Sequence, residues 1–399
     1  MLAVGLAADR AGPVIVDPAG VLLVLCGIVG LFFFLERRTG WKLFQYAPPL
    51  LWIYTLPVVL TNTGVLPAES DLYGGLKEYA LPIFITLMLL EIDLLAVVRV
   101  IGRGILVMLM GTIGVVIGGP IAYLLFHGFL GPHGWKGFGA LAGSWIGGTG
   151  NMAAVAGGIE TPPEEMGLAV LADNFVYLIW LPLLLASRSW LRGFSRFTRA
   201  DPDRVERMEA AVRGLATKSK EVEMRHVVYL VFLGIGAAAL AGTIAGRLPE
   251  VEPILTASTW KVLLVTTIGI LLSFTPAKRI PGSQPIAMAI IYVFVASMGA
   301  QAQLGGLARA PWFIAGAYVW IAIHGAFCLL GARLFRVDVH TAAIASAANI
   351  GGAASAPIVA AYHRETLIPV AVLMALVGYA LGNYLGFLTA QLCYVAGRL

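Results

Sequence analysis

Long apolar runs separated by short polar stretches make up most of this chain. Twelve of them have the length that a helix needs to cross a bilayer. They cover residues 18–36, 49–66, 76–97, 102–127, 136–158, 164–187, 226–247, 258–274, 284–304, 311–335, 340–361 and 366–395. Six runs precede one long polar stretch and six follow it. The pattern predicts an all-α polytopic membrane protein whose halves, residues 1–187 and 226–399, are joined by a linker over residues 188–225.

The linker between the halves is strongly basic. It holds ten Lys and Arg residues against six Asp and Glu residues between Arg188 and Arg225. Asp201 followed by Pro202 is typical of a helix start. Apolar residues then recur at helical spacing, at Val205, Met208, Val212 and Leu215. We expect a cytoplasmic linker with a short amphipathic helix on the inner membrane surface; a solvated linker is the alternative.

Two of the apolar runs contain residues that break helices. Four of the nine residues from Gly143 to Asn151 are glycine, which favours open backbone over helix. A related stretch, Ala345 to Ser355, lies in the eleventh run, and both contain Ile-Gly-Gly, at Ile146 and at Ile350. Backbone that leaves the helix inside a bilayer must line a cavity or be buried in protein. Broken segments in corresponding positions of two halves indicate the binding site of a secondary transporter.

The halves also match each other elsewhere. Residues 90–94 match 300–304 at the end of the third run, and residues 172–174 match 381–383 in the sixth. The three offsets, including that of the Gly-Gly motif, are 210, 204 and 209. Three matches in the same order indicate an internal duplication.

Loop charges favour hairpins for the two broken runs. If all twelve runs cross and the basic linker is inside, Arg37 and Arg38 fall outside, against the positive-inside tendency. If residues 136–158 and 340–361 are re-entrant hairpins, each half has five crossings, the repeats are inverted, and most basic loops are inside. We therefore predict ten crossings plus two hairpins, with the N-terminus and C-terminus outside. Two unbroken spans packed through small residues are the alternative.

The hairpin tips are the predicted substrate-binding site. Unwound backbone offers N–H groups to anions and C=O groups to cations, and the neighbouring hydroxyls and amides add side-chain ligands. The candidate residues are Ser144, Gly147, Gly148, Thr149, Gly150, Asn151, Ser346, Asn349, Gly351, Gly352 and Ser355. Oxygen donors suit Na⁺, which we expect near Asn151, Asp173 and Asn349. The alternative is a helix-packing interface of small residues.

Asp173 is the leading ion-coupling candidate. A carboxylate inside a span is costly and is a functional candidate by default. Asn174 follows it, and the repeat places Asn383 in the corresponding position. Asp173 is interpreted as a ligand of the coupling cation or as the carrier of a proton; a buried structural carboxylate is the alternative.

A second polar position ends the third run of each half. Glu91 and Asp93 correspond to Gln301 and Gln303 in the repeat. Glu91, the deeper of the acidic pair, and Gln301 are further ion-coupling candidates. The alternative is a membrane-boundary cluster neutralised by nearby arginines.

Composition excludes several classes of protein. The 399 residues are 59% hydrophobic and 12% charged, with a mean hydropathy of +0.86, whereas soluble domains carry about 25% charge. The net charge of +5 is explained by cytoplasmic loops, so no nucleic-acid partner is expected. No metal cluster, activated serine or phosphate loop stands out. We therefore expect neither an enzyme nor a cofactor.

The glycine motifs resemble those of known carriers. Gly147-Gly148-Thr149-Gly150 fits the Gly-Gly-x-Gly hairpin of bacterial sodium/glutamate symporters and 2-hydroxycarboxylate transporters, and Gly351-Gly352-Ala353-Ala354 lacks its last glycine. Residues 143–154 resemble more closely the YjcL-like family of membrane proteins, which looks like a branch of the same superfamily of cation/proton antiporters and anion transporters. The resemblance implies an elevator-type carrier that forms a homodimer.

The predicted function is secondary active transport in the cell inner membrane. The coupling ion would be Na⁺ or H⁺, and the cargo a small organic anion, amino acid or short peptide. The alternative is a cation/proton antiporter that uses Asp173.

Overall fold

The computed structural model describes residues 12–41, 43–46, 48–92, 100–201, 203–213 and 221–399. Its regular elements within these residues are helical. The principal helices of the first half are α1 (Pro18–Thr39), α3 (Pro49–Asn62), α5 (Leu81–Leu89), α7 (Gly104–Phe126), α8 (Gly134–Gly147), α9 (Thr149–Gly158) and α10 (Pro163–Ala186). Those of the second half are α13 (Met224–Ala245), α14 (Ala257–Ser273), α15 (Ser283–Ala300), α16 (Ala310–Phe335), α17 (Val339–Ile350), α18 (Gly352–Arg364) and α19 (Ile368–Ala396).

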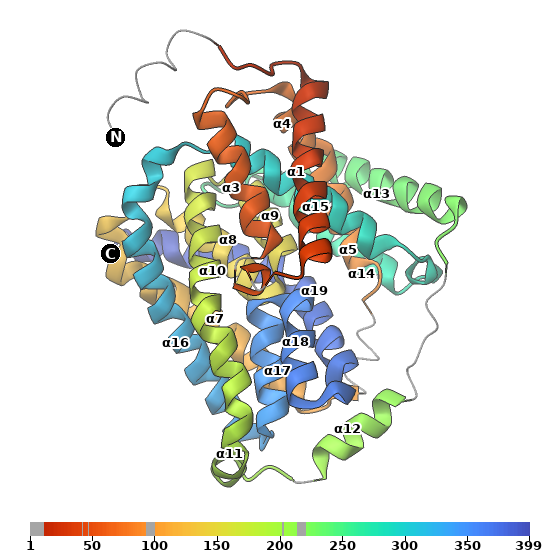
Figure 1. The fold of residues 1–399 in the computed structure, drawn as a ribbon, viewed down its shortest axis with the longest axis vertical. Coiled ribbons are helices and arrows are strands. Elements are labelled where there is room, and N and C mark those ends of the chain that lie inside the picture. The colour runs from red at the N-terminus through yellow and green to blue at the C-terminus, as the bar shows by residue number, and fades with distance from the viewer. Residues whose placement is uncertain (1–11, 42, 47, 93–99, 202, 214–220) are drawn as a thin grey trace.

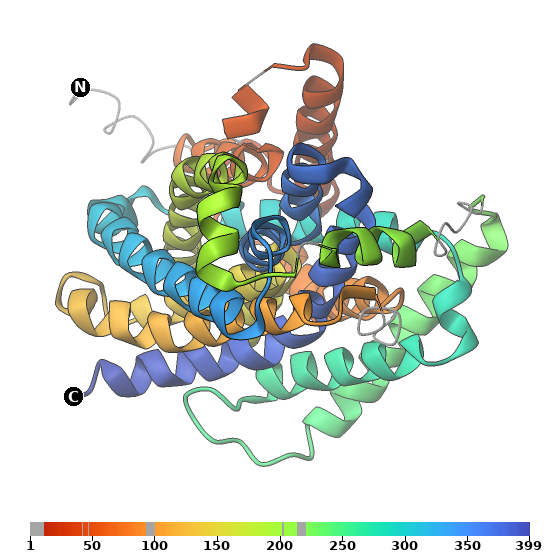
Figure 2. The ribbon, with the colours of Figure 1, turned by 90° about the horizontal axis from the view of Figure 1, so that it is seen from below.

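Shorter elements connect these helices. They are α2 (Leu43–Tyr46), α4 (Asp71–Gly75), the π-helical turn Leu76–Ala80, α11 (Leu191–Thr198), α12 (Arg204–Arg213) and the 3-10 turns His127–Phe129, Ser187–Trp190, Pro276–Arg279, Leu304–Arg309 and Glu365–Leu367. Figure 1 shows α4 and α12 at opposite ends of the molecule. Figure 2 shows α13 and α14 along the edge of the molecule opposite α1.

The helices follow the apolar runs because local sequence fixes where they start. Proline occupies the first turn of several of them, including α3, α10, α16 and α19, where its missing N–H would be unpaired anyway. Asp17 caps α1 by accepting from the backbone N–H groups of Ala19 and Gly20, both at 3.0 Å. Seven helical stretches of the described chain are long and apolar enough to cross a membrane. The protein is therefore a multi-pass membrane protein.

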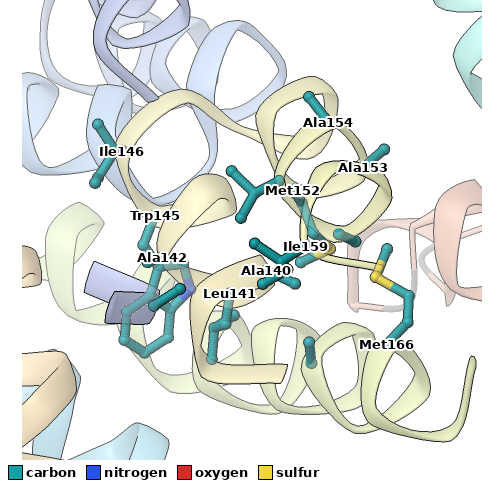
Figure 3. Close-up of a cluster of buried hydrophobic side chains, with 14 of the residues drawn as sticks. Ala140, Leu141, Ala142, Trp145, Ile146, Met152, Ala153, Ala154, Ile159 and Met166 are labelled. Carbon is teal, nitrogen blue, oxygen red and sulfur yellow. The ribbon is translucent and has the colours of Figure 1, made fainter. Parts of the chain in front are cut away.

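The fifth run folds back on itself as a helical hairpin, here called hairpin 1 (α8 and α9). A Cβ placed on Gly143 would lie 2.6 Å from the carbonyl oxygen of Asn151 in the returning helix. At the open end, Lys136 Nζ donates to the carbonyl of Glu160 at 3.2 Å. Figure 3 shows Trp145 and Ile146 of α8 on one side of the turn and residues of α9 on the other. The two helices therefore begin and end at the same end of the molecule.

The eleventh run forms an equivalent hairpin 2 (α17 and α18). The rings of His340, at the start of α17, and His363, near the end of α18, approach to 3.0 Å between their Nδ1 atoms. His363 also contacts the carbonyl of Leu184 in α10 through Nε2 at 2.9 Å. Asp338 caps α17 by accepting from the Thr341 N–H at 2.9 Å. Both broken runs are thus helix–turn–helix units.

The open ends of the two hairpins make polar contacts at two different ends of the fold. Glu160, beside hairpin 1, accepts from Lys77 at 2.7 Å and from Ser258 at 3.1 Å. Lys261 pairs with Glu78 in the same region, at 2.5 Å. This group of contacts, residues 77–78, 160 and 258–261, is called the ion-paired end below.

The other end carries the linker and hairpin 2. Arg204 of α12 approaches Asp338 to 3.9 Å, and Arg364, at the end of α18, pairs with Glu209 at 3.0 Å. Val205 and Met208 are buried in the apolar cluster that contains residues of α17 and α18. The predicted linker helix is present, and this apolar face packs against protein. Leu215 lies outside the described residues. This region is called the basic end below.

Helices α7 and α16 pack closely against each other. Three glycines of α7 make it possible, because a Cβ on Gly111, Gly114 or Gly118 would lie within 2.5–2.8 Å of its nearest neighbours, which include atoms of α16. Residues of α1, α3 and α15 form a separate apolar cluster. Helices α3 and α15 also contribute to the main apolar cluster that contains hairpin 1, through residues such as Tyr54 and Ile291.

Candidate binding site between the hairpin tips

The tips of the two hairpins meet. Gly148 and Gly352 have φ angles of 79° and 56°, which glycine adopts without strain. A Cβ on Gly148 would lie 3.5 Å from Cα of Gly352, and the reverse distance is 3.4 Å. The ring of Tyr379 in α19 lies beside both glycines. A side chain at either tip would lie against the other hairpin as well as adopting a strained backbone.

A cavity of about 100 Å³ lies beside the joined tips. Its lining combines both hairpins with α10, the start of α3 and α15: Pro48, Leu50, Ser144, Gly148, Thr149, Asp173, Asn174, Tyr177, Tyr292, Ile350, Gly351, Ala354 and Ser355. The volume corresponds to about three water molecules at ~30 Å³ each. It is below the roughly 300 Å³ of an ordinary small-molecule pocket. The cavity in this conformation is large enough for an ion with a few waters.

Asp173 joins α10 to hairpin 1. Its carboxylate accepts a hydrogen bond from Ser144 Oγ at 3.0 Å and one from Trp145 Nε1 at 2.8 Å. Hydrogen bonds to a charged acceptor are stronger than neutral ones. Asn174 bonds within its own helix, from Nδ2 to the Val170 carbonyl at 2.7 Å. Asp173 is therefore the acidic group of the cavity, and two donors from α8 fix its position.

Asn151 lies behind the tip of hairpin 1 and does not line the cavity. It is fully buried, and its Nδ2 donates to the Tyr379 carbonyl at 3.1 Å and to Asn383 Oδ1 at 2.9 Å. Asn383 in turn donates to Thr266 Oγ1 at 2.8 Å. Within the described part of the chain, nothing donates to Asn151 Oδ1. A buried acceptor without a donor is costly, and a cation would satisfy it.

Asn349 of hairpin 2 differs from Asn151 because both ends of its amide are paired. Its Nδ2 donates to the Met108 carbonyl at 2.9 Å, and its Oδ1 accepts from Thr112 Oγ1 at 3.2 Å. Both partners belong to α7. Asn349 therefore fixes hairpin 2 to α7.

Ser346 belongs to another polar group, away from the cavity. Its hydroxyl lies 3.0 Å from Nε2 of His324 and accepts from Trp180 Nε1 at 3.0 Å. His324 Nδ1 is 2.9 Å from the Gly111 carbonyl. This buried group connects α17 with α7, α10 and α16.

The remaining predicted residues surround the tips or lie at a distance. Gly147 packs against the Gly378 carbonyl, and Gly150 packs against Met88. Glu91 accepts from Ser283 at 2.7 Å, and its neighbour Asp93 lies outside the described residues. Gln301 donates to the Ser297 carbonyl of its own helix at 2.9 Å. Neither Glu91 nor Gln301 lines the cavity.

The structure thus brings one part of the predicted set together. The predicted residues in the cavity are Ser144, Gly148, Thr149, Asp173, Asn174, Gly351 and Ser355. Sequence reasoning missed Tyr177 and Tyr292. Tyr177 follows Asp173 by one helical turn and could have been found from that spacing. Tyr292 belongs to α15, and no local pattern connects it with the hairpins.

Comparison with known proteins supports the resemblance that the glycine motifs indicated. The chain is 28% identical over 345 residues to the "Uncharacterized membrane protein YjcL" of Bacillus subtilis (strain 168), which covers 82% of this chain and 85% of that protein. A family model described as "Protein of unknown function (DUF819)" matches residues 23–395. The prediction of a YjcL-like membrane protein is confirmed: the chain belongs to the DUF819 family.

Proposed function

We propose that this protein is a secondary active transporter that couples Na⁺ or H⁺ to the movement of a small organic anion, amino acid or short peptide. The observation that carries the proposal is the meeting of two hairpin tips, Gly148 and Gly352, beside a cavity that contains the Asp173 carboxylate. Broken helices that meet inside a membrane protein are typical of such binding sites. The helix ends that meet at the tips, together with the hydroxyls of Thr149 and Ser355 in the cavity lining, would offer ligands to both a cargo and an ion.

An elevator movement is consistent with the position of the cavity. Hairpins and α10 form one side, and Pro48, Leu50 and Tyr292 form the other. The second side belongs to α3 and α15, which share one apolar cluster with α1 and also contribute residues to the cluster that contains hairpin 1. In an elevator movement, the elements on one side of such a cavity slide past those on the other. In this proposal the hairpins carry the cargo, and the N-terminal helices remain fixed in a homodimer.

The two ends of the fold support an inverted arrangement of the halves. The open end of hairpin 1 contacts Lys77 and Ser258, and the open end of hairpin 2 contacts α10 and α12. Hairpins that enter from opposite faces match ten crossings plus two re-entrant segments. The positive-inside tendency puts the basic end in the cytoplasm, with both termini outside the inner membrane.

Sodium coupling is supported by the buried Asn151 oxygen, because hard cations take oxygen ligands. The test is thermal unfolding of the detergent-purified protein in NaCl against choline chloride. Saturating Na⁺ should stabilise the protein by about 2–3 kcal/mol at a concentration of one hundred times its Kd.

Two variants make this sodium test specific. Asn151→Ala should lose the Na⁺ response. Asn349→Ala should lower stability while keeping the response, because its amide is already paired. A protein that does not respond to Na⁺ at any pH is not a sodium symporter.

The second candidate, a cation/proton antiporter, is favoured by the position of Asp173. It is the acidic residue in the cavity lining, and a carboxylate can exchange a proton for a cation. Proteoliposomes should then show cation-driven pH changes in the absence of any organic cargo. Asp173→Asn should abolish them, because the amide keeps the contacts with Ser144 but cannot release a proton. Unchanged activity in this variant would exclude Asp173 as the exchanging group.

A further inference from the structure

An arginine-rich cavity of about 610 Å³ opens at the basic end. It lies between the residues that precede α7, the linker and the end of α16. Its charged lining is Arg103, Arg199, Arg204, Arg207, Arg336 and Asp201. This cavity is separate from the cavity at the hairpin tips and has no part in the proposed transport step.

The positive charge in this cavity is only partly compensated. Asp201 pairs with Arg207. The carboxylate nearest Arg204 is Asp338, at 3.9 Å, and Asp338 already accepts from the N–H of Thr341 at 2.9 Å and from its hydroxyl at 2.7 Å.

Arg204 is the least satisfied of these cations. Its side chain is 13% exposed, and its Nε has no hydrogen-bond partner in the described part of the chain. One terminal nitrogen donates to the Ile101 carbonyl at 3.3 Å. Burial lowers the pKa of Arg204, and the repulsion of Arg103 and Arg207 adds to this shift, although the attraction of Asp338 and Asp201 opposes it. The Arg204 guanidinium is therefore only loosely paired, because Asp338 lies beyond hydrogen-bonding distance.

Backbone geometry also fixes two of the arginines at the cavity. Arg199 and Arg336 end α11 and α16 with φ angles of 54° and 55°. Glycine is the usual residue in this left-handed conformation, because it has no Cβ. Two helices therefore end in arginine where glycine would be less strained, and both arginines line the same cavity.

We infer that this cavity binds an anion that carries two phosphate groups. Among the described lining residues, five carry a guanidinium group and one carries a carboxylate, so a ligand with several negative charges restores the balance. Guanidinium groups bind phosphate oxygens in pairs of parallel hydrogen bonds. The volume accepts a diphosphate together with part of the group esterified to it. A soluble diphosphate and a lipid headgroup that carries two phosphate groups share this chemistry.

Occupancy of the site would affect hairpin 2 through α12. Arg204 contacts Asp338 at the start of α17. Glu209 accepts from Arg364, the last residue of α18, at 3.0 Å and from Thr366, just after it, at 2.7 Å. Helix α12 therefore contacts both the start and the end of hairpin 2. An anion that holds α12 in place therefore stabilises these contacts with hairpin 2. The effect on transport rests on the proposed function, whereas binding does not.

The test uses the full-length protein in neutral detergent, with inorganic pyrophosphate as the soluble probe and sulfate at equal ionic strength as the control anion. Pyrophosphate should give a saturable rise in the thermal unfolding midpoint. The double variant Arg103→Gln/Arg336→Gln should raise the half-saturating concentration at least tenfold. A matched double variant, Arg225→Gln/Arg279→Gln, removes two charges outside the cavity lining and should respond like the parent protein.

A second arm distinguishes the lipid source. The protein is placed in nanodiscs of phosphatidylcholine with or without cardiolipin, which carries two phosphates. Hydrogen exchange of residues 352–367 is then measured. The site is assigned to lipid if cardiolipin protects these residues, the double variant Arg103→Gln/Arg336→Gln abolishes the protection, and pyrophosphate gives no response. The proposal is overturned if neither probe acts, or if both double variants respond equally, since that outcome indicates charge screening alone. Hydrogen exchange and unfolding need no transport activity, so a failed transport assay leaves this test intact.

Discussion

Hairpins 1 and 2 share a shape, but the surrounding protein encloses them to different extents. Every residue of α8 except Lys136 and every residue of α9 except Thr149 is buried. In α18, by contrast, Ile358 and Tyr362 are each 52% exposed. Both hairpins make polar contacts near the tip, through Ser144 and Asn151 in hairpin 1 and through Ser346 and Asn349 in hairpin 2, so the difference lies in how far their second helices are exposed.

This difference shows how similar motifs can take different roles. Hairpin 1 contacts α19 at backbone level, where a Cβ on Gly378 would lie 2.3 Å from the Ile146 carbonyl. Hairpin 2 is held at its base by α12, through Arg204 and Glu209. We therefore expect hairpin 2 to open more readily and hairpin 1 to move only with the helices around it. The predictions below test this contrast.

The largest expected effect is an all-or-none difference in labelling. Single cysteines replacing Glu160, beside hairpin 1, and Glu365, after hairpin 2, should react with a membrane-impermeant thiol reagent from opposite sides of the membrane. Both positions are exposed, so burial does not limit the reaction. The native Cys26, which is also exposed, is first replaced by serine in both variants. Labelling from the same side would contradict the opposed hairpins.

A smaller effect is expected from methyl groups added beside each tip. Gly378→Ala brings a Cβ into the backbone of hairpin 1, so overpacking should cost about 1–3 kcal/mol. Gly352→Ala meets no atom closer than 3.4 Å but has a φ of 56°, so only backbone strain, about 1–2 kcal/mol, applies. Thermal unfolding in detergent compares the two. A milder effect of Gly378→Ala would show that hairpin 1 is the more adaptable.

The smallest effect is expected at the ion-paired end. The hydrogen bond from Lys77 lowers the pKa of Glu160. The contribution of this pair to the free energy of unfolding is therefore present above the ordinary pKa of about 4.3, and it is lost as the pH falls through the pKa of the folded protein. Both partners are exposed, which limits the pair to about 1 kcal/mol or less. Glu160→Gln should therefore lower the unfolding midpoint slightly at pH 7 and not at low pH. A large loss at pH 7 would mean that this contact holds hairpin 1 in place.

The amino-acid sequence determined the positions of the helices and their breaks. Each predicted run contains a helix or a pair of helices, because apolar length, proline starts and glycine breaks act locally. Glycine at 148 and 352 marked both turns for the same reason. Family membership could also be predicted, since the motif from Gly143 to Ala154 is a local feature.

Tertiary structure alone decided which side chains share the cavity. Asn151 and Ser144 stand equally close to the first tip in sequence, yet helical phase turns Ser144 towards Asp173 and Asn151 towards Asn383. Tyr292 and the arginines of the basic end come from segments far apart in the chain, and only helix packing brings them together. Local patterns determine where a helix lies along the chain. Which of its faces meets another helix depends on how all the helices are arranged, and no single segment contains that information.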